Sequence, residues 1–145
     1  ISWEFDDNRY GHVDWLTNMK LDTLANRKAW HKEKNFKINQ WLEYNEKDSL
    51  ITKTVDKMAF DFPRKSGKIK ARYADNVFRI ETSCIKSFSV NIAPEMVDTN
   101  KKVRIFVNGK LRFDKRIGYD ASLMLKNFDA TQDRNQVWIN QIDIR

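Results

Sequence analysis

Residues 68–82 read KIKARYADNVFRIET, and this stretch decides the fold class. Apolar and charged residues alternate on both sides of Asp75-Asn76, two residue types that tolerate the positive φ angles of a tight turn. A two-residue turn there pairs Tyr73 with Phe78 and Ala71 with Ile80, which puts the apolar partners on one face. The register and the hydrophobic pattern agree, and together they predict a β-hairpin.

The chain continues from this hairpin as short alternating runs. The next run has apolar residues expected inward and small polar residues outward, namely Phe88, Val90 and Ile92 against Ser87, Ser89 and Asn91. We expect Pro94 to end this strand, because proline cannot donate a ladder hydrogen bond.

A second hairpin signal, Asn108-Gly109, follows the run of Val103, Ile105 and Val107. A two-residue turn would place Leu111 and Phe113 of the following strand opposite Phe106 and Arg104. These two apolar residues would then lie off the face that carries Val103 and Ile105. A three-residue loop over 107–109, with a left-handed Gly109 and a bulge, is closed by the pair Phe106 and Lys110. It brings the apolar residues of the two strands onto the same face. We therefore predict the three-residue loop, which places Ile105 opposite Leu111 and Val103 opposite Phe113.

The C-terminal part predicts one helix and one strand. Asp120 is a good N-cap, and apolar residues follow it at helical spacing: Ala121, Met124, Leu125 and Phe128. Residues 136–144 form a last strand with apolar residues on both faces, which favours a central or covered position.

The first third is less regular. One or two strands are expected within 12–21, and residues 35–39 alternate as a strand does. Residues 48–62 predict a loop that enters another strand, which ends at Pro63. Many short strands with a single short helix predict an all-β, antiparallel, jelly-roll-like β-sandwich, formed as one domain by residues 1–145.

Composition excludes several protein classes. The chain has 145 residues, of which 41% are hydrophobic and 32% charged, with only 4 Gly and 2 Pro. This balance is not that of a disordered or collagen-like chain. No apolar run approaches the roughly 18 residues that cross a bilayer, so no membrane span is expected. The single cysteine forms no internal disulfide and no multi-cysteine zinc site.

The chain is basic, with a formal net charge of +7. Excess positive charge suggests nucleic acid as a partner. Lysine and arginine are nevertheless interleaved with acids, as in Lys32-Glu33-Lys34, and the densest stretch, residues 64–72, alternates with apolar residues. A solvated basic face is the better interpretation, and we expect no nucleic-acid partner.

Catalytic motifs are absent from the sequence. It has no Gly-x-Ser-x-Gly, no phosphate-binding glycine loop and no His-Glu-x-x-His. Its histidines are His12 and His31, and a pair of either with Cys84 is formally possible. A lone cysteine beside a strand is more often a small core or edge residue. We expect no catalytic residue, no cofactor and no metal in this chain.

Acidic residues offer candidate sites of weak specificity. The visible candidates are Asp6, Asp7, Asp61, Asp98, Asp129 and Asp133. A glycosidase needs two carboxyl groups at a defined separation, which sequence does not supply. Residues 129–133 lack the Asp-x-Asp-x-Asp-Gly pattern of a calcium loop. Solvated loop acids are the better interpretation.

Aromatic residues gather in the first third and are the remaining candidates: Trp15, Trp30, Trp41 and Tyr44. Exposed rings of this kind stack against sugars, because they combine a flat apolar face with a polar rim. The alternative is that they fill the core or an interface to a neighbouring domain, and we favour that alternative.

The second half of the chain resembles a known family in the order of its motifs: NVFRIETS at 76–83, PEMVD at 94–98, KVRIFVNGK at 102–110 and DR at 133–134. This order resembles the C-terminal β-sandwich domain attached to bacterial α/β-hydrolase-type proteins of the esterase or peptidase-like kind. In that family the catalytic Ser, Asp and His belong to the hydrolase domain, so no catalytic residue carries over.

The resemblance implies a non-catalytic accessory domain whose partner is an N-terminal catalytic domain of the same chain. Because residue 1 is Ile and no signal-like stretch follows it, we expect a longer parent chain. The alternative function is a carbohydrate-binding module that uses an aromatic surface. The compartment stays open, with a secreted or periplasmic location one option.

Overall fold

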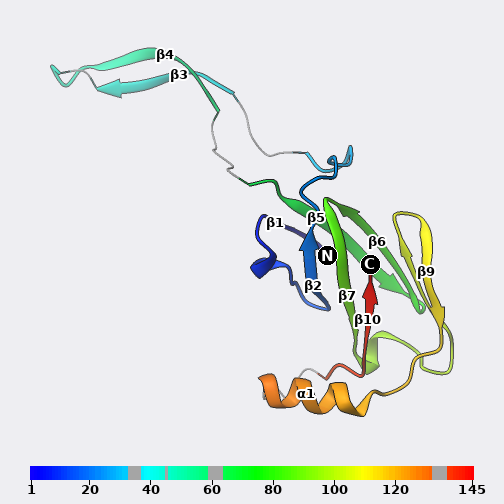
Figure 1. Cartoon of the computed structure of the whole chain (residues 1–145). Helices are drawn as coiled ribbons and strands as arrows, with labels where there is room; N and C mark the ends of the chain where they lie inside the picture. Colours follow the sequence, from blue (N-terminus) through cyan, green and yellow to red (C-terminus); the bar gives the residue numbers. More distant parts are fainter. Residues whose placement is uncertain (33–36, 45, 59–63, 132–136) are drawn as a thin grey trace.

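The computed structural model describes residues 1–32, 37–44, 46–58, 64–131 and 137–145, and most of them lie in β-strands (Figure 1). The elements in chain order are β1 (Ser2–Phe5), η1 (Asn8–Tyr10), β2 (Leu16–Leu21), β3 (Lys37–Tyr44), β4 (Leu50–Met58), β5 (Gly67–Ala74), β6 (Val77–Ser83), β7 (Ile85–Ile92), η2 (Pro94–Met96), β8 (Val103–Val107), β9 (Lys110–Lys115), α1 (Ala121–Thr131) and β10 (Asn140–Ile144).

These strands form three sheets. Their orders are β1-β5-β6-β8-β9, β10-β7-β2 and β3-β4. Neighbouring strands are antiparallel except for β6 and β8, which run parallel because the chain visits β7 in the other sheet between them. The all-β fold with one short helix, predicted from the sequence, is confirmed.

The two larger sheets share one core. Trp15, just before β2, meets the rings of Tyr73 and Phe78 edge-on, with centroids 5.6 and 5.4 Å apart. The largest fully buried apolar side chains come from both sheets and the segments between them: Phe78, Leu16, Met19, Ile69, Ile80, Ile92, Ile105, Ile139, Val90 and Val103. The core therefore has the form of a sandwich.

The hairpin of β5 and β6 has the predicted register. Tyr73 pairs with Phe78 and Ala71 with Ile80. Asp75 and Asn76 take φ angles of 52° and 64°, as the two-residue turn requires.

The three-residue loop predicted for the second hairpin is wrong. Val107 pairs directly with Lys110 across a two-residue turn, and Asn108 and Gly109 both have positive φ, at 52° and 81°. The bulge lies within β9 instead, where Arg112 is the extra residue and the register shifts so that Ile105 faces Phe113. Phe113, rather than Leu111, therefore lies opposite Ile105 on the apolar face, and Leu111 is exposed.

Two further predictions about strands are corrected. The last strand begins at Asn140 and lies at the edge of its sheet, whereas β7 takes the centre. Ser89 and Asn91 of β7, expected to be solvent-facing, are buried because neighbouring polar side chains cover them. Ser89 donates to Asp143 Oδ1 at 2.6 Å, and Asn91 donates to Thr17 Oγ1 at 3.2 Å.

Helix α1 begins as predicted. The Asp120 carboxylate accepts the backbone N–H of Leu123 at 3.0 Å, which is an N-cap contact. Met124 packs against the core, but Leu125 is exposed and so departs from the predicted apolar face. The side chain of Phe128 lies outside the described residues. No helix in the described ranges is both long and apolar enough to span a membrane.

The first third supplies two core strands and an arm. Strand β2 covers part of the 12–21 segment, and β1, which the sequence pattern did not predict, pairs with β5. Strands β3 and β4 form a hairpin that stands away from the sandwich, and we call it the arm (Figure 1). Residues 35 and 36 and the predicted strand end at Pro63 lie outside the described residues.

Candidate functional site

Cys84 marks the corner where the chain leaves one sheet for the other. It is the single residue between β6 and β7 and has a φ angle of 58°. Its buried thiol lies 3.5 Å from the carbonyl oxygen of Ala25 and 4.0 Å from Ser83 Oγ. His31 contacts Ser83 rather than Cys84. The geometry gives Cys84 a structural position and provides no cysteine–histidine pair.

A carboxylate, an imidazole and a hydroxyl do lie in line beside this corner. His31 Nε2 is 2.9 Å from Glu4 Oε1, and His31 Nδ1 is 2.9 Å from Ser83 Oγ. The hydroxyl of Ser66 donates to the same Glu4 oxygen at 2.7 Å. These are the residue types of a serine-hydrolase triad, so their accessibility decides what they can do.

The Ser83 hydroxyl of this network is covered, whereas Ser66, whose hydroxyl lies 3.4 Å from His31 Nε2, is half-buried. Ser83 is only 1% exposed and His31 3%. Ser83 Oγ also accepts the backbone N–H of Lys28 at 3.0 Å, and the carbonyl of Lys28 accepts the N–H of His31 at 2.9 Å. The network therefore fixes the loop that contains Lys28 and His31 onto β1 and β6.

The ionisation of Glu4 reflects these contacts. Partial burial acts to raise the pKa of Glu4, but hydrogen bonds with His31 and Ser66 and the positive charge of Lys68 outweigh it. The pKa of Glu4 consequently lies below its ordinary value of 4.5, and the carboxylate stays ionised at neutral pH.

Asp7 and Asp98, two of the acidic candidates with described side chains, are held by hydrogen bonds within the fold. Asp7 accepts hydrogen bonds from Arg9 and Arg64, and the bonds from Arg9 are the main cause that lowers its pKa to about 2. Asp98 accepts the N–H of Asn100 at 2.9 Å. Asp61, Asp129 and Asp133 lie outside the residues whose side chains are described. Across the described part of the chain, no group of three His, Cys, Asp or Glu residues is placed to hold a metal.

The four aromatic candidates are not brought together on one surface. Trp15 is 3% exposed and belongs to the core, so its ring is not available to a sugar. Trp30 is half-buried, with Lys70 Nζ 4.6 Å from its ring centroid. Tyr44 on β3 is 73% exposed. Trp41 lies on β3 as well, and its side chain is outside the described residues.

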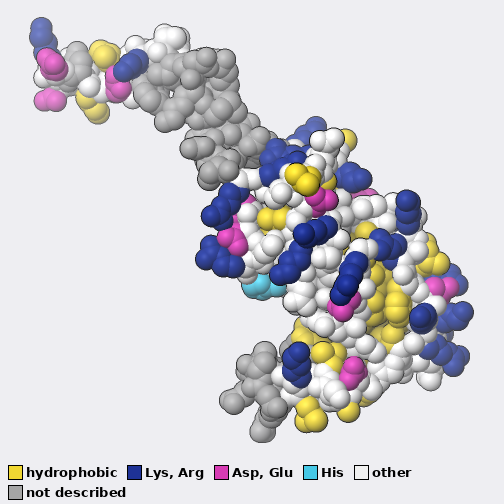
Figure 2. Space-filling view, viewed as in Figure 1, with side chains coloured by type: hydrophobic (Ala, Val, Ile, Leu, Met, Phe, Trp, Pro, Cys, Tyr) yellow, Lys and Arg dark blue, Asp and Glu magenta, His cyan; other side chains and the backbone are white. Residues whose placement is uncertain are grey.

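The arm exposes a contiguous apolar face. Tyr44 pairs with Leu50, and Leu42 lies two residues along β3 on the same face. We call these three residues the arm face; Leu42 is 62% and Leu50 56% exposed. Ile51 is also exposed and lies on the opposite face, beside Glu43. Figure 2 shows hydrophobic and charged side chains side by side at the far end of the arm.

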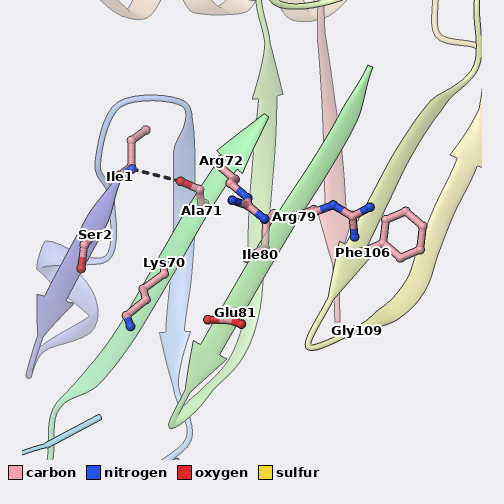
Figure 3. A pocket seen from close by; sticks show the side chains of 10 residues that line it. All are labelled: Ile1, Ser2, Lys70, Ala71, Arg72, Arg79, Ile80, Glu81, Phe106 and Gly109. Carbon is pink, nitrogen blue, oxygen red and sulfur yellow. Dashed lines mark hydrogen bonds between the residues drawn. The ribbon is translucent and has the colours of Figure 1, made fainter. Parts of the chain in front are cut away.

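An open pocket of about 700 Å³ lies on the outer surface of the five-stranded sheet (Figure 3). Its charged lining comes from β5 and β6 and consists of Lys70, Arg72, Arg79 and Glu81. Phe106 of β8 forms one wall, with the Arg79 guanidinium 4.9 Å from its ring centroid. The pocket is basic with an aromatic side.

No protein-family model, curated protein or solved structure matches the chain. The resemblance to a hydrolase-attached domain therefore remains a prediction.

Sequence reasoning missed the buried network and the basic pocket for different reasons. Glu4, His31 and Ser83 are 27 and 52 residues apart along the chain, and no local pattern joins them. The pocket did carry a signal, because the predicted hairpin register already places Arg72 opposite Arg79.

Proposed function

We propose that this chain is a non-catalytic accessory β-sandwich domain of a hydrolase, which packs against the catalytic domain of the same polypeptide and supports it. The observation that carries the proposal is the arm face, where Leu42, Tyr44 and Leu50 are exposed together on a two-stranded hairpin.

The physical argument is one of marginal stability. A two-stranded hairpin that packs on nothing is barely stable in water. Contiguous exposed apolar side chains mark interaction surfaces, and burying one leucine contributes roughly 1.5–3 kcal/mol. Contact with a second domain covers the arm face and orders the hairpin at the same time. The apolar character of Leu42 and Leu50 favours a protein surface as the occupant.

The non-catalytic part of the proposal is supported by burial. Ser83, His31 and Cys84 are covered and bonded within the fold. The half-buried Ser66 hydroxyl beside His31 donates to Glu4. The hydrolase part derives from the motif order at 76–83, 94–98 and 102–110, whose family keeps its catalytic residues on the other domain.

The carbohydrate alternative has weaker support. A stacking platform needs several coplanar exposed rings, yet Trp15 lies in the core and Trp30 lies against Lys70. Among the described side chains of the four candidates, Tyr44 is the one that is largely exposed.

A turnover assay tests the non-catalytic part. The 145-residue domain, purified alone, is expected to hydrolyse no ester, amide or glycoside substrate. Saturable hydrolysis that His31→Ala abolishes would contradict the proposal and would return the buried network to a catalytic role.

A pair of variants in the full-length polypeptide tests the docking. Leu42→Asp puts a charge on the arm face and is expected to lower the melting midpoint of the hydrolase domain by about 2–4 °C. Ile51→Asp makes the same chemical change on the opposite face and is expected to leave that midpoint unchanged. Equal effects of the two variants, or a polypeptide without an α/β-hydrolase domain, would contradict the proposal.

A further inference from the structure

Two arginines face each other across the hairpin of β5 and β6. Arg72 pairs directly with Arg79. Both lie on the outer face, because the adjacent residues Ala71 and Ile80 are buried in the core. Like charges directly opposite in an antiparallel pair destabilise a sheet. The direct pairing of Arg72 with Arg79 is therefore unfavourable for the stability of this hairpin.

The two charges are also left uncompensated. Within the described residues, neither Arg72 nor Arg79 has a carboxylate at ion-pair distance. The neighbouring Arg104 differs, since its guanidinium lies 3.5 Å from Asp114. Among the described residues, Arg72 and Arg79 thus place two guanidinium groups without an ion pair opposite each other on the sheet.

Both arginines line the pocket shown in Figure 3. Arg79 extends toward Phe106, so a cation and an aromatic ring border the same space. Lys70 adds a third positive charge, and Glu81, its partner across the strands, supplies one negative charge. Three cations against one carboxylate leave the pocket with a net positive charge.

We propose that this pocket binds a small organic oxyanion, with a carboxylate or phosphate group between Arg72 and Arg79 and its apolar part against Phe106. Guanidinium groups recognise carboxylate and phosphate through paired N–H donors, and a bound anion relieves the repulsion between the two arginines. The volume of about 700 Å³ suits a small molecule.

A polyanion is the less favoured occupant. A nucleic-acid backbone requires a stripe of free positive charge along the surface. Here the positive charge is interrupted, since Arg104 is paired with Asp114 and the carboxylate of Glu81 stands opposite Lys70 on the hairpin. A single anionic group matches this arrangement better.

The test is a calorimetric titration of the domain with benzoate and with phenyl phosphate. Benzyl alcohol is the neutral probe. We expect at least one anion to bind and benzyl alcohol not to bind. Arg72→Gln and Arg79→Gln are each expected to weaken binding tenfold or more. Lys86→Gln removes an exposed charge from the other sheet and is the matched control, with unchanged affinity.

A second readout separates binding from folding. Because each glutamine variant removes a like-charge contact, both are expected to melt at or above the temperature of the parent domain while they lose the anion. Binding that survives both arginine variants, equal loss in Lys86→Gln, or no binding of either anion would overturn the proposal. Binding of a single-stranded oligonucleotide through Arg72 and Arg79, without binding of the small anions, would also overturn it.

Discussion

At the scale of single residues, His31 is a buried polar side chain that joins two strands. It is buried and contacts both Ser83 and Glu4 at 2.9 Å. His31→Ala leaves a small cavity and takes a partner from both groups, so we expect a loss of about 2–3 kcal/mol in the free energy of unfolding. Urea denaturation measures it. His12→Ala, at the exposed histidine, is the control and should change stability by less than about 0.5 kcal/mol.

Glu4 makes the same network sensitive to acid. The pKa of Glu4 is lowered in the folded chain, so its ionised form stabilises the fold above the ordinary pKa of 4.5. That contribution disappears as the pH falls through the folded-state pKa. The stability difference between the parent and Glu4→Gln should therefore be largest near neutral pH and shrink below pH 4.5. A difference that grows toward acid pH would show that the carboxylate destabilises the fold.

At the scale of elements, the turn between β8 and β9 depends on a contact with another strand. Asn108 Oδ1 accepts the N–H of Thr82 at 3.0 Å, and Asn108 Nδ2 donates to Thr82 Oγ1 at 3.1 Å. Asn108→Ala removes both bonds and puts alanine at a φ angle of 52°. We expect it to cost about 2 kcal/mol. Thermal unfolding tests this, with Asn100→Ala, an exposed loop asparagine, as the variant that should change little.

The same turn explains which elements the sequence could predict. The hairpin of β5 and β6 follows from local alternation and a turn of two residues, so its register was predictable. The turn at Asn108-Gly109 is also fixed by Thr82, which lies 26 residues away, and the bulge moved to Arg112. Comparing the apolar faces of the two hairpin strands could not reveal that contact, because Thr82 belongs to another strand. Strand β1 buries only Phe5, and so its sequence carried little pattern.

At the scale of the whole molecule, the sandwich and the arm differ in what holds them. The described core residues come from the two larger sheets, the segments that join them and α1, and none comes from β3 or β4. The sequence predicted strands in both parts, because alternation is local. It could not predict that the apolar side chains of one part are buried whereas Leu42 and Tyr44 of the other stay exposed.

Amide hydrogen exchange across the arm, compared between the isolated 145-residue domain and the full-length polypeptide, tests the docking of this domain most directly. In the isolated domain the amides of β3 and β4 are expected to exchange fast, and those of β5 and β6 slowly. In the full-length polypeptide the arm amides should become protected, while the exchange of β5 and β6 stays the same. Arm amides that exchange equally fast in both would show that no neighbouring domain covers the arm face.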